Sequence, residues 1–171
     1  MQLKETREAL NKFAKYVIQQ ARTNLTKEKK NVTKELYNSL EYMPFIKGDK
    51  IGVKFYMEDY GVFQDRGVKG TKSNYIENKK SPFSYKKTEG NKGMPPPKAF
   101  ADFIKKKGIK GRDKKSGRFI TTKSLQFLIA RSIFQKGIKA SMFFTKPFER
   151  AFKYLPPELH ESFVTDIENA I

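Results

Sequence analysis

Residues 47–56 read Lys-Gly-Asp-Lys-Ile-Gly-Val-Lys-Phe-Tyr, and this stretch decides the fold class. The Gly-Asp pair is a turn signal, because glycine accepts backbone conformations that tight turns require. After the turn, Ile51, Val53 and Phe55 alternate with residues that face the other way, as in a half-buried strand. The sequence therefore predicts one β-hairpin centred on this turn.

Working outward, the sequence before the hairpin has helical periodicity. Residues 3 to about 28 carry apolar residues at spacings of three, four and seven, which predicts an amphipathic helix. Its apolar face consists of Leu3, Leu10, Phe13, Val17, Ala21 and Leu25. Basic residues cover the rest of the helix, so it could lie on a membrane or bind a partner. We expect it instead to pack on the protein's own sheet.

Helices are also predicted after the hairpin. A short helix follows Pro95-Pro96-Pro97 and ends at Gly108, and a longer one runs from Thr121 or Thr122 to about Lys136. The longer helix is expected to be deeply packed. Thr145-Lys146-Pro147 begins another helix, because proline is tolerated in the first turn. The last helix follows Pro156-Pro157 and carries an apolar stripe of Leu159, Phe163, Ile167 and Ile171.

These elements predict an α+β fold in which a small antiparallel sheet packs against an N-terminal helix and C-terminal helices. We expect a single domain over residues 1–171, with a core of residues 1–66 and 119–171 and a long basic insertion at 67–118. Residues 67–97 have no strong periodicity, which predicts a long loop or an arm that is ordered only in an assembly. Residues 60–67 are expected to form a strand or a short helix that ends at the glycine.

The positive charge of the chain is concentrated in its middle. The chain has 36 Lys and Arg against 18 Asp and Glu, a net charge of +18. Residues 66–123 contain 18 of the basic residues and 4 acidic ones, so this segment alone carries +14. Such a segment attracts phosphate or an acidic protein surface, and the attraction weakens with salt. The alternative is that the lysines only keep the protein soluble.

The composition excludes several kinds of chemistry. The chain has no cysteine and a single histidine, His160, so thiolate nucleophiles, cysteine-based metal sites and most histidine relays are not available. We expect His160 to lie on the surface. No apolar run is long enough for a membrane span, and the first residues lack the apolar region of a signal peptide. We expect no enzyme activity, no cofactor, no metal and no membrane contact.

The one acidic grouping to consider for catalysis consists of Glu58, Asp59 and Asp65. Metal-dependent nucleases need carboxylates that converge on Mg²⁺ beside a basic DNA surface. However, no lysine follows at the spacing of the common nuclease motifs, and adjacent residues of a strand point to opposite faces. We therefore do not expect a nuclease. A phosphate-binding loop is not expected either, because Gly70 is followed by Thr71 rather than lysine.

Two stretches carry a family resemblance. The first is Tyr60-Gly61-Val62-Phe63-Gln64-Asp65-Arg66-Gly67 after the hairpin, and the second is Lys146-Pro147-Phe148-Glu149-Arg150-Ala151-Phe152 before the last helix. Over residues 1–70 and 120–171 the chain resembles the tail-completion, or head-to-tail joining, proteins of tailed bacteriophages. The positions that match the family's pattern are Tyr60, Phe63, Asp65, Gly67, Pro147, Phe148 and Ala151. The Lys- and Asn-rich style and residues 137–144 resemble proteins of crAss-like phages.

The resemblance implies a structural virion protein, made in the host cytoplasm, that forms a ring in the neck or tail. The ring is expected to be a homo-oligomer, twelve-fold in symmetry, that contacts the portal or adjacent neck and tail ring proteins. Double-stranded DNA would pass through its lumen. The chain departs from the family at Asp65 and Arg66, where glutamate and a Gly-Thr pair are usual, and its insertion at residues 70–120 is longer.

The basic insertion has two expected roles. It could bind acidic virion partners, or it could face DNA. We favour acidic partners, because a strongly basic lumen would bind tightly to DNA that must slide through it. The candidate contacts for either role are Lys105, Lys106, Lys107, Lys110, Arg112, Lys114, Lys115 and Arg118. The alternative to a virion protein is a free basic nucleic-acid-binding protein that acts in the host cytoplasm. Such a protein would bind DNA alone, with an affinity that falls steeply in salt.

Overall fold

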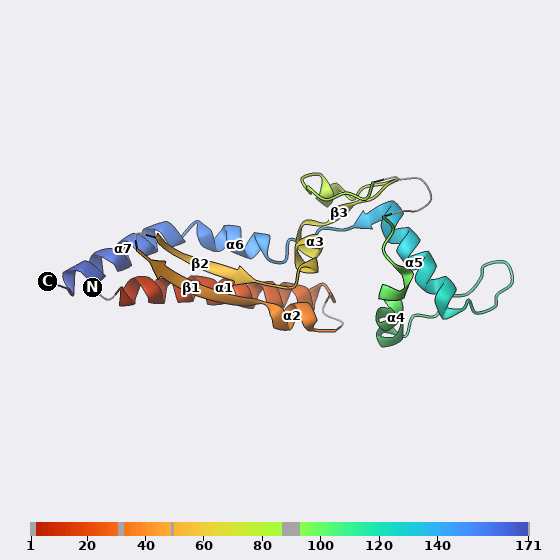
Figure 1. Ribbon diagram of the computed structural model, residues 1–171, viewed down its shortest axis with the longest axis horizontal. Coiled ribbons are helices and arrows are strands. Elements are labelled where there is room, and N and C mark those ends of the chain that lie inside the picture. The colour runs from red at the N-terminus through yellow and green to blue at the C-terminus, as the bar shows by residue number, and fades with distance from the viewer. Residues whose placement is uncertain (1–2, 31–32, 49, 87–92, 171) are drawn as a thin grey trace. The chain divides into compact units, whose positions relative to one another are not determined.

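The computed structural model describes residues 3–30, 33–48, 50–86 and 93–170 (Figure 1). Its contacts divide the chain into two compact units. Unit 1 consists of residues 1–61 and 142–171, and unit 2 consists of residues 62–141. We expected the basic insertion to span residues 67–118 of a single domain. The unit that carries it is wider on both sides, and it includes the helix that precedes residue 137.

Unit 1 has the α+β fold that the sequence predicts. Its helices are α1 (Lys4–Lys27), α2 (Glu35–Ser39), α6 (Thr145–Phe152) and α7 (Leu155–Glu168), and its strands are β1 (Glu41–Lys47) and β2 (Lys50–Tyr56). The strands pair antiparallel, with Lys47 opposite Lys50. Gly48 lies in the connection between them with a φ of 60°, which is the backbone conformation that its lack of a side chain allows. The predicted hairpin and its turn are confirmed.

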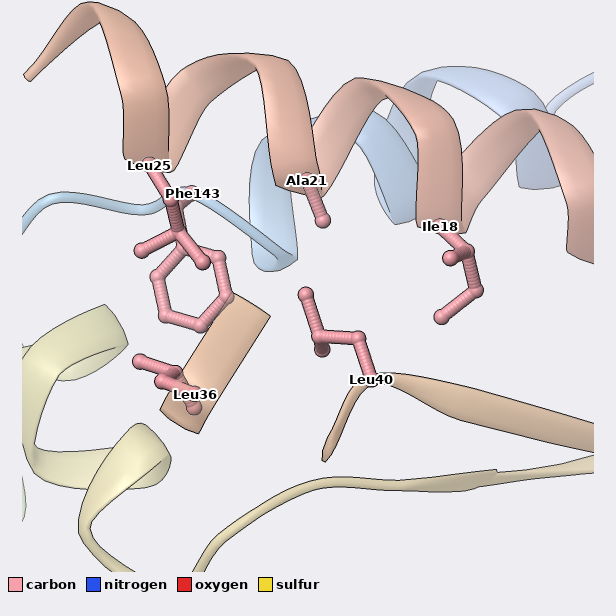
Figure 2. Close-up of a cluster of buried hydrophobic side chains, with 6 residues drawn as sticks. All are labelled: Ile18, Ala21, Leu25, Leu36, Leu40 and Phe143. Carbon is pink, nitrogen blue, oxygen red and sulfur yellow. The ribbon is translucent and has the colours of Figure 1, made fainter. Parts of the chain in front are cut away.

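The core of unit 1 is built around α1. Figure 2 shows one buried cluster, in which α1 residues meet side chains from α2 and from the segment before α6. It consists of Ile18, Ala21, Leu25, Leu36, Leu40 and Phe143. A second cluster contains Phe13, Val17 and Leu155, against which Phe55 and Phe148 pack. The N-terminal helix therefore packs on the protein's own hairpin and C-terminal helices, as expected.

The first turn of α1 is capped from the far end of the chain. No side chain at the start of α1 caps the helix itself. Instead, the carboxylate of Asp166 on α7 accepts hydrogen bonds from the backbone N–H groups of Glu5 and Thr6, both at 2.9 Å, and from the Thr6 hydroxyl at 2.7 Å. Helix N-termini favour carboxylates because their first N–H groups lack partners within the helix. Asp166 therefore fastens α7 to α1.

We predict that Asp166→Ala lowers the stability of the protein in a pH-dependent way. Burial pushes the pKa of Asp166 upward, but the hydrogen bonds from Thr6 and Glu5 outweigh it and hold the pKa below its ordinary 3.8. The contribution of Asp166 is therefore full above that value and is lost as the pH falls through the depressed folded pKa. Urea unfolding should separate variant from wild type at pH 7 and bring them together in acid.

The neighbouring Glu168→Ala is the control for this prediction, because Glu168 is an exposed carboxylate on the same helix. It should unfold like the wild type at every pH. An Asp166→Ala variant as stable as Glu168→Ala at pH 7 would contradict the capping role.

Unit 2 contains short elements and one longer helix. They are α3 (Tyr60–Arg66, shared with unit 1 at its first two residues), β3 (Val68–Lys69), the 3₁₀ helices η1 (Ile76–Asn78) and η3 (Pro97–Phe100), α4 (Ala101–Lys107), α5 (Thr122–Lys136) and β4 (Gly137–Ile138). β3 and β4 pair antiparallel. Of the two alternatives for residues 60–67, the short helix is correct, and Gly67 ends it with a φ of 73°.

The segment after Gly67 is more ordered than the arm that we expected. Asn78 is fully buried, and its amide donates to the backbone carbonyls of Val68, at 2.9 Å, and Ile138, at 2.8 Å. Its side-chain oxygen accepts from the Ala140 N–H at 2.8 Å. Asn78 thus joins this segment to β3 and β4 without a partner chain. Within the predicted arm, residues 87–92 lie outside the described residues.

Two apolar faces are less buried than their periodicity indicates. We expected α5 to be deeply packed, but only its Ala130 and Phe134 are buried, while Leu128 is 48% exposed. The reason is that α5 packs mainly on η3 and α4, which are too short to cover it. On α7, Phe163 is 40% exposed, and the Ile171 of the same stripe lies outside the described residues. The caps were correct: Thr121 accepts from the Ser124 N–H at 3.2 Å.

Candidate basic binding surface

Unit 2 holds nearly all the excess positive charge of the protein. Its 80 residues include 21 Lys and Arg against 5 Asp and Glu, a net charge of +16. Unit 1 carries the remaining 15 basic and 13 acidic residues, so it is almost neutral. The charge of unit 2, +16, is larger than the +14 of residues 66–123 that the sequence indicated. An anionic partner would therefore be attracted to unit 2.

Part of the basic insertion forms a hairpin-like loop, which we call the 111–120 loop. Arg112 and Phe119 form an antiparallel bridge. Further along, the Asp113 N–H donates to the Arg118 carbonyl at 2.9 Å, and the Ile120 N–H donates to the Gly111 carbonyl at 3.0 Å. In Figure 1 this loop projects beyond the start of α5. The loop therefore presents its side chains from a hydrogen-bonded frame.

Asp113 organises the tip of the loop. Its carboxylate accepts hydrogen bonds from the backbone N–H groups of Ser116, at 2.7 Å, and Lys115, at 3.1 Å, and from the Ser116 hydroxyl at 2.9 Å. The hydrogen bonds from Ser116 lower the pKa of Asp113 most, and the Lys115 N–H adds to them. An acidic residue inside a basic segment is thus used to fold the tip. Its short polar side chain is typical of turns.

An aromatic side chain lies within the charged loop. Phe119 is 61% exposed, and the Arg112 guanidinium lies over its ring at 4.2 Å from the centroid. Such a cation–π contact holds a flexible arginine in one place. Exposed aromatic rings beside cations are the surface on which nucleic acid bases stack. The loop thus combines charges for phosphate with a ring that a base could contact.

All eight candidate basic residues are exposed, and the structure places them in two groups. Lys105, Lys106 and Lys107 form the last turn of α4, where positive charge is favourable, and Gly108 ends the helix with a φ of 60°. The other group comprises Lys110, Arg112, Lys114, Lys115 and Arg118, which lie on the 111–120 loop or directly before it. The sequence identified these charges; the Arg112–Phe119 contact needed the structure.

Most of the residues that carry the family resemblance are buried or contact other parts of the fold. Asp65 is buried, and the Phe63 ring meets the Phe83 ring edge to face at 4.7 Å between centroids. Gly67 closes α3, and Tyr60 is 44% exposed. On α6, Pro147 is buried, and Phe148 and Ala151 pack against the second core cluster. These residues therefore hold α3 and α6 in place.

The acidic grouping does not form a metal site. Glu58 and Asp59 are exposed in unit 1, whereas Asp65 is buried in unit 2. Across residues 3–30, 33–48, 50–86 and 93–170, no three His, Cys, Asp or Glu side chains gather where they could hold a metal ion. In the same ranges, no helix has the length and apolar character needed to cross a membrane. His160 is exposed, as predicted.

Sequence reasoning missed a groove on unit 1. The groove has a volume of about 450 Å³ and lies where α6 meets α7 against the first half of α1. Its lining is formed by Lys12, Phe13, Tyr16, Arg150, Ala151, Lys153, Tyr154, Leu155 and Glu158. This volume is in the range of sites that bind ligands or side chains of a partner. The available signal was Tyr16, an aromatic residue beside the apolar stripe of α1.

Comparison of the chain with family models, curated proteins and solved structures found no match.

Proposed function

We propose that this chain is a structural subunit of a ring in the neck or tail of a tailed phage, through which double-stranded DNA passes. The observation that carries the proposal is the incomplete sheet of unit 1. Among the described residues β1 and β2 pair only with each other, so each strand has an outer edge with unpaired backbone groups. A neighbouring subunit that pairs with one of these edges would give the unpaired backbone groups their partners.

The apolar surface of the same hairpin supports this proposal. Met43 on β1 and Tyr56 on β2 are 54% and 45% exposed, and by the register of the strands both lie on the hairpin face opposite to the one that carries Phe55. Monomeric proteins rarely expose large contiguous apolar patches, and such patches mark interfaces. In unit 2, Ile76 and Leu128 are exposed as well. Subunits of an assembly bury this kind of surface against one another.

The resemblance to tail-completion proteins supports the location in the virion. Its two stretches fall on α3 with Gly67 and on α6. In this proposal the portal or an adjacent ring protein is the second partner. The basic charge of unit 2 then attracts either an acidic surface of that partner or the DNA in the lumen.

The proposal is tested by measuring the mass of the purified protein with light scattering, at low and moderate salt, and by imaging it with electron microscopy. We expect a concentration-dependent closed oligomer that is visible as a ring. A protein that stays monomeric at every concentration would contradict the proposal.

The 111–120 loop favours a second candidate function, a free nucleic-acid-binding protein. Its ordered basic tip and the exposed Phe119 ring have the composition of a surface that tracks a phosphate backbone and stacks bases. This candidate needs no ring. It requires that the protein alone binds DNA tightly at low salt and loosely at high salt.

We predict that reversing four charges of this loop weakens DNA binding if the second candidate is correct. The variant carries Lys110→Glu, Arg112→Glu, Lys114→Glu and Lys115→Glu. Loss of up to four phosphate contacts should lower the affinity at least about 10-fold and flatten the dependence of log K on log salt by roughly 3 to 4 units. Fluorescence anisotropy with labelled duplex and single-stranded DNA measures both.

A control variant places the same charge change on unit 1, with Lys4, Lys15, Lys27 and Lys29 changed to glutamate. These lysines are exposed and lie on or just after α1. A loss of DNA binding that is equal in the two variants would mean that net charge, and not the 111–120 loop, is responsible.

A further inference from the structure

The groove of unit 1 has an apolar floor and a basic rim. Phe13 and Leu155 are buried at its base, whereas Tyr16 and Tyr154 are 44% and 74% exposed at its sides. Lys12 is joined to Glu158 by an ion pair of 2.7 Å.

Two further cations of the rim have no such partner. Within the described part of the chain, Arg150 and Lys153 make no ion pair with a carboxylate, and both are exposed. The groove is therefore suited to an apolar or aromatic side chain that is accompanied by negative charge.

A surface with the opposite properties lies elsewhere on unit 1, and we call it the 56–60 patch. It consists of the exposed residues Tyr56, Glu58, Asp59 and Tyr60 at the end of β2 and the start of α3. Glu35 of α2 lies beside it. Burial is the largest cause that raises the pKa of Tyr60, and the charges of Glu35 and Glu58 raise it further. Glu35 and Glu58 thus act on the exposed Tyr60, and the exposed Asp59 precedes Tyr60 in the chain.

We propose that the 56–60 patch of one copy of this chain docks into the α6–α7 groove of the next copy. This contact depends on the proposed ring and identifies the surfaces that would build it. Glu58 and Asp59 pair with Arg150 and Lys153 across the contact, and the Tyr56 ring enters the groove.

The two surfaces are separate, so one copy can use both at once. The patch lies near α2, whose Leu36 packs beside Leu25 of α1. The groove lies at Lys12 to Tyr16 of the same helix. Nine residues of helix separate Tyr16 from Leu25, roughly 13 Å along its axis. Figure 1 likewise shows that β2 ends beside α2 and away from the turn between α6 and α7.

A contact between two different surfaces is head-to-tail, and repeating it closes a ring when the rotation between copies allows it. A nucleic acid is a poorer occupant of the groove. Unit 1 as a whole carries almost no net charge, and the floor of the groove is apolar, whereas a phosphate backbone binds through several cations. A protein segment with both an aromatic ring and carboxylates can place the ring on the apolar floor and pair the carboxylates with the cations of the rim.

The test uses two charge-reversal variants of the full chain. The groove variant carries Arg150→Glu and Lys153→Glu, and the patch variant carries Glu58→Lys and Asp59→Lys. In each variant the two surfaces have the same sign, so we expect self-association at least about 100-fold weaker than in the wild type. Analytical ultracentrifugation and native mass spectrometry measure the assembly.

Mixing the two variants should restore assembly, because each variant then offers the charge that the other lacks. The restored oligomer should contain the two chains in equal numbers, and a single chain with all four changes should also assemble. The control is Lys15→Glu with Lys27→Glu, two exposed positions of unit 1 outside both surfaces, which should assemble like the wild type.

The outcomes separate this inference from the proposed function. A wild type that forms rings while both variants assemble normally would overturn the docking contact and leave the ring intact. Weak assembly of each variant without rescue on mixing would also overturn it, since the charges would then not face each other. A wild type that never assembles would overturn the ring and the contact together. Nucleic acid that binds the wild type but not the groove variant would assign the groove to another occupant and would overturn the docking contact.

Discussion

Replacing Phe143 with alanine is expected to remove about 3–5 kcal/mol from the stability of unit 1, the usual cost of deleting a buried aromatic ring. The Phe143 ring is fully buried in the cluster shown in Figure 2, between Leu25 of α1 and Leu36 of α2. It is the largest fully buried side chain in the described part of the protein. Truncation leaves a cavity that the surrounding elements can fill only partly.

Urea unfolding followed by circular dichroism measures this loss for Phe143→Ala. The matched control is Phe152→Ala at the end of α6, because Phe152 is the same residue type with half of its surface exposed. The control should cost less than about 1 kcal/mol. Equal losses in the two variants would mean that the cluster does not hold the helices of unit 1 together.

Replacing Asn78 with alanine is expected to have the largest effect on unit 2. The change removes the buried hydrogen bonds to the Val68 carbonyl and from the Ala140 N–H, and the partly buried one to the Ile138 carbonyl. A buried polar group left without a partner costs about 1–3 kcal/mol. With three such groups we expect a total loss of at least about 3 kcal/mol.

Amide hydrogen exchange localises this effect, because protection should fall in β3, β4 and the segment between Gly67 and Asn78 while unit 1 stays protected. Asn38→Ala is the control, since Asn38 is exposed on α2. Asn78→Asp sharpens the test: the carboxylate has nearly the same shape but cannot donate to the two carbonyls. Full stability of Asn78→Asp would contradict the role of those two hydrogen bonds.

The parts of the fold that sequence predicted are those that local rules specify. The hairpin follows from the Gly48 turn and the alternation after it, and α1 follows from a stripe of regular spacing. The Thr121 cap and the Gly137 end of α5 are likewise local. Each of these signals lies within a few residues of the structure that it specifies.

The parts that sequence did not predict depend on distant partners. Asp166 caps α1 through Thr6, which lies 160 residues earlier, and Asn78 bonds to residues on both sides of α5. Neither partner can be read from the neighbouring sequence. Periodicity also overstated the burial of α5, because an apolar stripe shows which face is buried only when something covers it.

The binding role of the candidate basic surface stays a prediction, but the structure shows where its residues lie. The eight basic residues were found from composition, and all of them are exposed. The frame of the 111–120 loop was not foreseen, because it depends on the cross-loop bridge of Arg112 and Phe119 and on the hydrogen bonds of Asp113. The groove was missed because its residues come from three helices, whose packing brings them together.

The division of the chain into units has an evolutionary consequence. The chain enters unit 2 after Gly61 and leaves it after Ser141, and the Ser141 N–H donates to the carbonyls of Gln64, at 3.2 Å, and Asp65, at 3.1 Å. The two segments by which the chain enters and leaves unit 2 are therefore joined by hydrogen bonds. Such a cassette can be lengthened, shortened or exchanged between related genes while the core clusters of unit 1 keep their contacts. The charge of unit 2 can then change to suit its binding partner, while the fold of unit 1 is kept.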